Sequence, residues 1–389
     1  MELEVWHLLV IPLFFVLGWV SARVDIRHVM QESRAVPRSY FKGLNYLLNE
    51  QPDRAIEAFL EVAKMDPDTL ELHFALGTLF RRRGELDRAI RIHQNLVDRA
   101  DLAQEPRMKA LYELGQDFLK AGLLDRAEAV FRRLETGVHA LDALRALLEI
   151  QMLTKAWSDA IHTASRLEKM GFPALNADVA HFHCELAAAA LLKSDAMAAR
   201  NALEGALKQN QRSARAWIML GDLEAQAGND EKAIADWRRI EELNPPYLPI
   251  VAERLLQAYQ RMKQESSGLA LLRAYLEQQP SADLLHFLFQ SVAQQQGWSA
   301  ARQLASDELK RYPSLRALDD YLQACNGMNP DATDGGVENQ LAQNLVHRQV
   351  SQDANFLCGN CGFKSRQFFW QCPACARWET IGPERGQHA

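Results

Sequence analysis

Cysteine is scarce along most of this chain. Of its six cysteines, only Cys184 and Cys325 lie outside the C-terminal segment, and both stand far apart in helical patterns. A cysteine in such a position behaves as a small buried apolar residue. The composition therefore does not fit a secreted protein that is stapled by disulfides.

Two further absences exclude other classes of protein. The chain has no excess of positive charge, since its formal net charge is −6 over 389 residues, whereas a nucleic-acid-binding protein is expected to carry a basic patch. It also has no glycine-rich fingerprint for NAD or a flavin. The sequence therefore does not predict a nucleotide-dependent oxidoreductase, and nothing in it indicates a catalytic site.

The remaining four cysteines form two C-x2-C brackets near the C-terminus, namely Cys358–Cys361 and Cys372–Cys375. Each bracket lets two thiolates converge on one ion from a tight turn, and the second completes a tetrahedron. Two disulfides are the alternative, but they require an oxidising compartment. We predict one bound metal ion, with zinc ahead of iron, in a module of residues 353–389. Because sulfur fills all four positions, the metal is expected to be structural.

The N-terminus carries the one long apolar run of the sequence. Val5–Ala22 contains no Asp, Glu, Lys or Arg, which fits a single transmembrane helix and predicts an anchor at residues 1–22. A juxtamembrane segment, residues 23–35, follows it. On this side of the apolar run, positive residues outnumber Asp25 and Glu32; they are Arg23, Arg27, Arg34, Arg38 and Lys42. By the positive-inside rule the N-terminus is then periplasmic and the rest of the chain cytoplasmic. A cleaved secretory signal is the alternative, but the residues before the apolar run are acidic.

The body of the chain is predicted to be all-α and repetitive. Glycines recur 12 residues before alanines, and large residues follow each alanine by four; the pairs are Gly43–Ala55, Gly77–Ala89, Gly115–Ala127 and Gly221–Ala233. This pattern resembles the tetratricopeptide repeat, a helical pair of about 34 residues. We predict a solenoid over residues 36–325, with about eight repeats and a capping helix at Ser314–Ala324. Such solenoids present a concave surface that binds peptides or helices.

Two local clusters in the solenoid are interpreted as structural. His181, His183 and Cys184 fall on the first helix of a repeat, where packing residues are expected, rather than forming a second metal site. Arg81–Arg83 is interpreted as a solvated basic cap on a helix end, with a docking patch for an acidic partner as the alternative.

A linker and a connecting helix, residues 326–352, are predicted between the solenoid and the metal module. Asn326–Gly336 is rich in turn formers, whereas Val337–Gln352 has a helical pattern with a polar face.

Taken along its whole length, the chain resembles the lipopolysaccharide assembly protein B family of Gram-negative bacteria. The resemblance lies in the anchor, the repeats and the segment from Leu357 to Thr380, in which all four cysteines match a rubredoxin-like module. It implies an inner-membrane, non-enzymatic adaptor that faces the cytoplasm and regulates lipopolysaccharide synthesis.

The resemblance also implies specific partners. These are an FtsH-type membrane metalloprotease, the UDP-acyl-N-acetylglucosamine deacetylase that it degrades, an inner-membrane protein that senses lipopolysaccharide, and other lipopolysaccharide assembly proteins.

Two alternative functions follow from the metal module. A rubredoxin-like electron carrier would hold iron, but the ten residues between the brackets are few for a redox rubredoxin. A zinc ribbon that binds nucleic acid would need a basic surface, yet residues 353–389 carry only one net positive charge.

Overall fold

The computed structural model describes residues 41–43, 45, 46, 49, 51–65, 70–328, 336–353 and 356–383. The chain divides into two compact units, residues 1–150 and 151–389. None of the helices in the described ranges is both long and apolar enough to cross a membrane. The predicted anchor 1–22 and juxtamembrane segment 23–35 lie outside these ranges.

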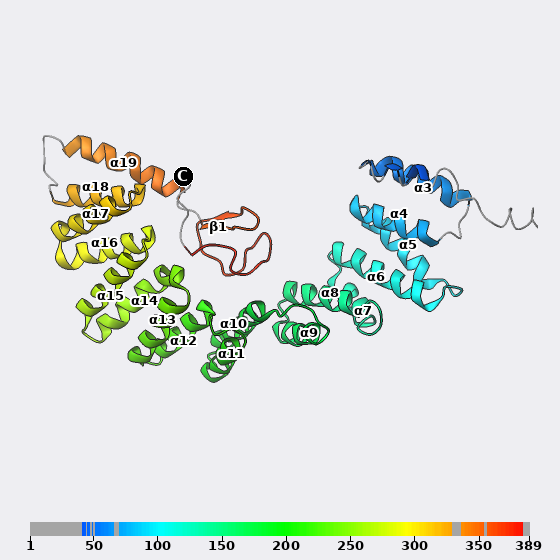
Figure 1. The fold of residues 1–389 in the computed structure, drawn as a ribbon, viewed down its shortest axis with the longest axis horizontal. Coiled ribbons are helices and arrows are strands. Elements are labelled where there is room, and N and C mark those ends of the chain that lie inside the picture. Colours follow the sequence, from blue (N-terminus) through cyan, green and yellow to red (C-terminus); the bar gives the residue numbers. More distant parts are fainter. Residues whose placement is uncertain are drawn as a thin grey trace, which may run out of the picture. The chain divides into compact units, whose positions relative to one another are not determined.

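The first unit is a succession of helices (Figure 1). Its described helices are α3 (Pro52–Met65), α4 (Leu70–Arg82), α5 (Leu86–Asp98), α6 (Gln104–Lys120), α7 (Leu124–Arg132) and most of α8 (Ala140–Leu153). Neighbours in this succession pack as antiparallel pairs, α4 with α5 and α6 with α7.

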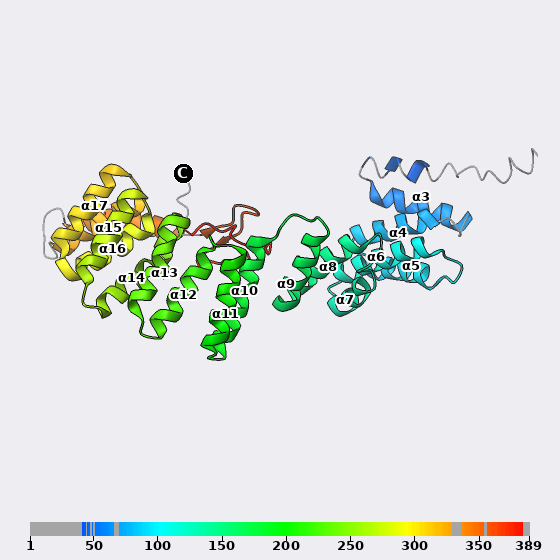
Figure 2. The same ribbon diagram turned by 60° about the horizontal axis from the view of Figure 1, so that its bottom comes forward.

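The second unit continues the helical succession and ends in a small β-containing module (Figures 1 and 2). Its helices up to the solenoid end are α9 (Trp157–Lys169), α10 (Asn176–Leu192), α11 (Ala196–Gln209), α12 (Ala214–Gln226), α13 (Asp230–Leu243), the 3-10 turn η1 (Pro245–Tyr247), α14 (Leu248–Arg261), α15 (Glu265–Gln278), α16 (Ala282–Gln296) and α17 (Trp298–Arg311). They are followed by α18 (Leu315–Met328), α19 (Gly336–Asp353), β1 (Phe356–Leu357) and β2 (Lys364–Ser365).

The Gly–Ala pattern explains how the helices pair. A Cβ added at Gly115 would lie 2.8 Å from the ring of Phe131, so the glycine admits a ring from the partner helix. Gly221 faces the indole of Trp237 in the same way. The alanine one turn before Phe131, Ala127, is fully buried. The predicted all-α architecture of helix pairs is confirmed.

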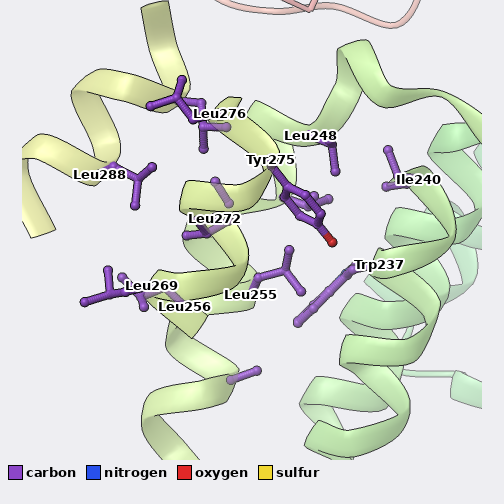
Figure 3. Close-up of a cluster of buried hydrophobic side chains, with 14 of the residues drawn as sticks. Trp237, Ile240, Leu248, Leu255, Leu256, Leu269, Leu272, Tyr275, Leu276 and Leu288 are labelled. Carbon is purple, nitrogen blue, oxygen red and sulfur yellow. The ribbon is translucent and has the colours of Figure 1, made fainter. Parts of the chain in front are cut away.

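Within the second unit, successive helices bury apolar side chains against one another, which is the packing that makes a solenoid stable. Figure 3 shows one such cluster, in which Trp237, Leu255 and Tyr275 lie between α13, α14 and α15. The Tyr275 hydroxyl donates to Glu241 Oε2 at 2.8 Å, so the polar end of this buried ring is satisfied.

The interpretation of Arg81 as a solvated cap is wrong. Its guanidinium lies 2.8 Å from Asp117 Oδ1 and 2.5 Å from Glu113 Oε2, both on α6. Asp117 is completely buried and also contacts His93 of α5. Arg81 therefore balances the charge of a buried carboxylate, and this carboxylate connects α4, α5 and α6. The residues next to Arg81 in the sequence gave no sign of this contact.

The end of the solenoid differs from the prediction. The capping helix was expected to stop at Ala324, but α18 continues to Met328 through residues that were read as turn formers. Glycine at position 327 serves packing rather than a turn. A Cβ there would lie 2.5 Å from the indole of Trp298, so only a residue without a side chain lets the two helices approach this closely. α19 then packs on α18, with Asn326 Nδ2 donating to Gln343 Oε1 at 2.6 Å.

Candidate metal centre and its docking face

The four cysteine sulfurs converge on one point. All four Sγ atoms of Cys358, Cys361, Cys372 and Cys375 lie within 4.8 Å of one another, the distance being 3.8 Å for Cys358–Cys375 and 3.7 Å for Cys361–Cys372. A tetrahedron of sulfurs around zinc, with Zn–S bonds of about 2.3 Å, has edges of about 3.8 Å. The donor set thus fits one tetrahedral metal ion, and all six cysteines are free thiols.

Short hydrogen-bonded turns shape the two brackets. β1 pairs with β2 in antiparallel register, Phe356 opposite Ser365, so the first bracket sits in the turn of a hairpin. Gly362 has a φ of +74°, which glycine adopts without strain, and its N–H donates to Cys358 O at 2.9 Å. The second bracket closes in the same way, with Ala376 N–H donating to Cys372 O at 2.8 Å.

The surroundings of the sulfurs favour thiolates in part of the cluster. The Thr380 hydroxyl lies 3.3 Å from Cys358 Sγ and, with nearby backbone N–H groups, lowers the pKa of Cys358 to about 6. The Arg377 N–H lowers the pKa of Cys375. The Phe363 N–H acts in the same sense on Cys361, but partial desolvation of the thiol and its hydrogen bonds to the three neighbouring sulfurs outweigh it and raise that pKa to about 12. Metal ligands must be deprotonated, so these donors aid binding.

Beyond its cysteines, the module has little core. Phe356, Cys358, Cys372 and Ile381 are its buried members, and only Phe363, Phe368, Phe369 and Cys375 pack partly against them. So few apolar contacts give a separate domain little stability. A metal ion held by the four sulfurs would therefore contribute much of the folding free energy of the module.

The metal module, residues 356–383, is docked on the solenoid. Trp378 is only 9% exposed, because its indole stacks on the ring of His181 of α10, with centroids 4.6 Å apart and an angle of 6°. Trp157 of α9 and Phe182 of α10 meet the same indole edge-on at 6.1 and 6.4 Å. The Arg215 guanidinium of α12 lies 5.6 Å from its centroid. One tryptophan thus contacts three helices.

A second tryptophan extends this contact along the solenoid. Trp370 stacks on Tyr247 of η1 with centroids 5.1 Å apart, and Phe368 meets Tyr247 edge-on at 6.3 Å. Burial raises the pKa of Tyr247. We call the solenoid residues in these contacts the docking face: Trp157, His181, Phe182, Arg215 and Tyr247. Figure 1 shows the module on the side of α10, α12 and α14 that carries this face.

The module and the docking face also share a polar contact. His181 Nε2 lies 3.1 Å from Glu379 Oε1, next to Trp378 in the sequence. His181 was interpreted as a packing residue rather than a metal ligand, and it does pack, although its partner is the metal module rather than a neighbouring repeat. Cys184 is completely buried, and burial raises its pKa to about 12, as expected for an inert structural thiol.

Comparisons with known families agree with this architecture. Residues 356–383 match the family model described as a rubredoxin metal binding domain, and residues 42–103 and 184–247 match the tetratricopeptide repeat. The all-α tetratricopeptide solenoid with a C-terminal zinc ribbon is therefore confirmed, whereas the predicted transmembrane helix falls outside the described residues.

Curated relatives match the chain along nearly its whole length. It is 34% identical over 383 residues to lipopolysaccharide assembly protein B of Escherichia coli (strain K12), covering 97% of both chains. It is 30% identical over 393 residues to the protein of the same name from Haemophilus influenzae, covering 97% of this chain and 98% of that protein.

Solved structures of repeat proteins are more distant. The TPR2AB domain of yeast Sti1 in a complex with pHSP90 matches at 18% identity and a TM-score of 0.33, covering 74% of this chain and 97% of that one. A tetratricopeptide repeat protein from Parabacteroides merdae matches at 16% identity and a TM-score of 0.27, covering 75% of this chain and all of that one.

Proposed function

Since this chain belongs to the lipopolysaccharide assembly protein B family, we propose that it is a membrane-tethered adaptor that regulates lipopolysaccharide biosynthesis. Its relatives are named as assembly proteins, and its body is a tetratricopeptide scaffold, so the protein is not an enzyme. The observation that carries the proposal is the match over 97% of the chain, which includes both the solenoid and the metal module.

The adaptor acts by bringing two proteins together. In our proposal it presents the UDP-acyl-N-acetylglucosamine deacetylase to an FtsH-type membrane protease, which degrades the deacetylase. An inner-membrane protein that senses lipopolysaccharide restrains the adaptor, and other lipopolysaccharide assembly proteins are further candidate partners. Solenoid surfaces of this kind bind peptides and helices, which supports the role. No nucleic acid takes part.

The location would follow from the predicted N-terminal anchor. Residues 1–22 would cross the inner membrane once, with the N-terminus in the periplasm and the solenoid, the linker and the metal module in the cytoplasm. Tethering raises the local concentration of the adaptor near a membrane-bound protease, so modest contacts are sufficient for delivery.

The metal has a structural role in this proposal. Cys358, Cys361, Cys372 and Cys375 would hold one ion, which we propose to be zinc, with no open position for a substrate or water. When bound, the ion crosslinks two turns that have almost no apolar core of their own. Its task is therefore to keep the module folded and docked, while the solenoid contacts the partners.

The half-life of the deacetylase in growing cells tests the proposal. Cells that lack this protein should accumulate the deacetylase, and the full chain should restore its rapid loss only while the FtsH-type protease is active. Purified adaptor should also retain both proteins on one affinity resin. An unchanged half-life in the deletion strain would exclude the adaptor role.

A further inference from the structure

The residues that dock the metal module are held in place by its cysteine turns. Trp378 stands between Arg377, whose carbonyl accepts from Cys372 N–H at 2.9 Å, and Glu379, whose N–H donates to Trp370 O at 2.8 Å. Thr380, two residues further on, contacts the other bracket through Cys358 Sγ. The two docking tryptophans are thus fixed to each other by the same short segments that hold the sulfurs together.

This arrangement makes docking depend on the fold of the module. With four buried residues in its cluster, the module cannot keep Trp370 and Trp378 in position once the brackets open. Cys361 is exposed to solvent, so a chelator can reach the sulfur cluster without first undocking the module.

Among the described residues, several buried polar atoms in the interface between the module and the docking face lack a hydrogen-bond partner, which favours reversible release of the module. Within the part of the chain that the structure describes, Trp378 Nε1, His181 Nδ1 and Arg215 Nη1 are buried without a hydrogen-bond partner in the protein. Buried polar atoms that are left unpaired weaken a contact. Phe356 and Pro383 of the module also line an open pocket of about 310 Å³ together with Ile250, Phe287 and Arg316 of the solenoid, so the two parts are not closely packed there.

We propose that metal occupancy acts as a latch: the metal-bound module stays docked, and metal loss releases it and uncovers the docking face on α9–α14. This proposal rests on the metal coordination proposed above and gives that site a regulatory role. The uncovered face offers aromatic rings from Trp157, Phe182 and Tyr247 beside His181 and Arg215. It therefore suits a partner segment with the chemistry of the module itself, an aromatic side chain next to a carboxylate.

Chemical footprinting of the full chain in detergent tests the latch. His181 is 1% exposed, so diethylpyrocarbonate should modify it slowly in the metal-bound protein. Removal of the metal with 1,10-phenanthroline under reducing conditions should raise the rate at which His181 is modified on the order of tenfold. A buried side chain reacts only when the structure around it opens, and here the module would have left the docking face. Added zinc should restore protection. The exposed His162 serves as an internal reference whose labelling stays constant.

Two variants separate the latch from general unfolding. The Trp378→Ala variant should keep its metal, but its His181 should be modified rapidly even without a chelator. The substitution removes the indole that stacks on His181 in the docked state. Arg366→Ala, at an exposed position of the same module, should behave like the wild type.

The two proposals fail in different ways. If metal analysis shows complete removal while His181 stays protected, the latch is wrong and the metal site stands. If the purified chain binds neither zinc nor iron, the proposed metal site is wrong, and the latch, which depends on it, is wrong as well.

Discussion

His93 Nδ1 lies 2.5 Å from Asp117 Oδ2, and both side chains are completely buried between α5 and α6. The second oxygen of Asp117 accepts from Arg81 of α4, so one carboxylate joins three consecutive helices. His93 occupies the position where other repeats place a phenylalanine or tryptophan against a glycine; here the ring faces Gly77.

Replacing Asp117 with Ala should destabilise the first unit by about 3–5 kcal/mol, because Arg81 and His93 lose the group that balances them in a buried site. Urea unfolding followed by circular dichroism measures the loss. Asp125→Ala, at an exposed position in the first turn of α7, is the control and should cost no more than about 0.5 kcal/mol. A loss below about 1 kcal/mol for Asp117→Ala would show that the network adds little.

A serine in place of Cys358 should abolish metal binding and unfold the module, since three thiolates cannot close the tetrahedron. Helical content should stay close to that of the wild type, because the repeats pack on one another. Metal analysis and circular dichroism measure the two effects. Cys325→Ser, which changes a thiol in α18, is the control and should keep its metal. A Cys358→Ser protein with a full metal complement would contradict the proposed site.

The purified chain should be colourless and contain one zinc ion. Four thiolates in a closed tetrahedron suit zinc, which has no visible absorption from d-electron transitions. Elemental analysis and an absorption spectrum settle the identity. A red protein that contains iron would instead favour the electron-carrier alternative.

Stability should depend on pH through Asp320, which is completely buried beside His286 at 2.6 Å. Burial raises its pKa above the usual 3.8 in the folded state. The folded state therefore binds this proton more tightly than the unfolded state. The stability that this proton contributes is fully present below the unfolded pKa and is lost as the pH rises through the folded pKa.

Asp320→Asn, which cannot ionise and still accepts from His286, should thus gain stability relative to the wild type as the pH rises above the unfolded pKa of about 4. Denaturant unfolding over a series of pH values from about 4 upward measures the difference. The exposed Asp307→Asn is the control and should track the wild type throughout. A difference that stays constant with pH would show that the pKa of Asp320 is not raised.

Deletion of residues 1–22 should give a folded protein that no longer controls the deacetylase, because co-localisation with the protease is lost. The deacetylase half-life is the measurement. An unrelated transmembrane helix of the same orientation should restore control if the segment is a tether. Full control by the untethered form would show that the anchor is dispensable.

The convergence of the four cysteines could be predicted from the sequence, whereas the docking of the module on the solenoid could not. The four cysteines lie in two short brackets, so their convergence follows from local turn geometry. Trp378 and His181 are about 200 residues apart in the sequence, and no local pattern tells a docking tryptophan from one that folds the module. The aromatic residues between the brackets could be assigned only to the small core of the module.

The helix pairs were predictable for a similar reason. The Gly–Ala spacing repeats because the same close crossing of two helices recurs, as at Gly115 and Phe131. Departures from the pattern were not predictable. Arg81 looked like an ordinary helix-end cation because its carboxylate partners lie on another repeat, and Gly327 looked like a turn former because Trp298, which requires it, comes from the preceding helix.

The docked module has a consequence for synthesis on the ribosome. Phe182 is translated about 200 residues before Ile381, which takes roughly 10–40 s at about 5–20 residues per second. In the later part of that interval the aromatic surface of α9–α14 has been translated, whereas the segment that covers it has not. The nascent chain therefore exposes an apolar surface to chaperones until residues 356–383 have been translated and have closed over the helices.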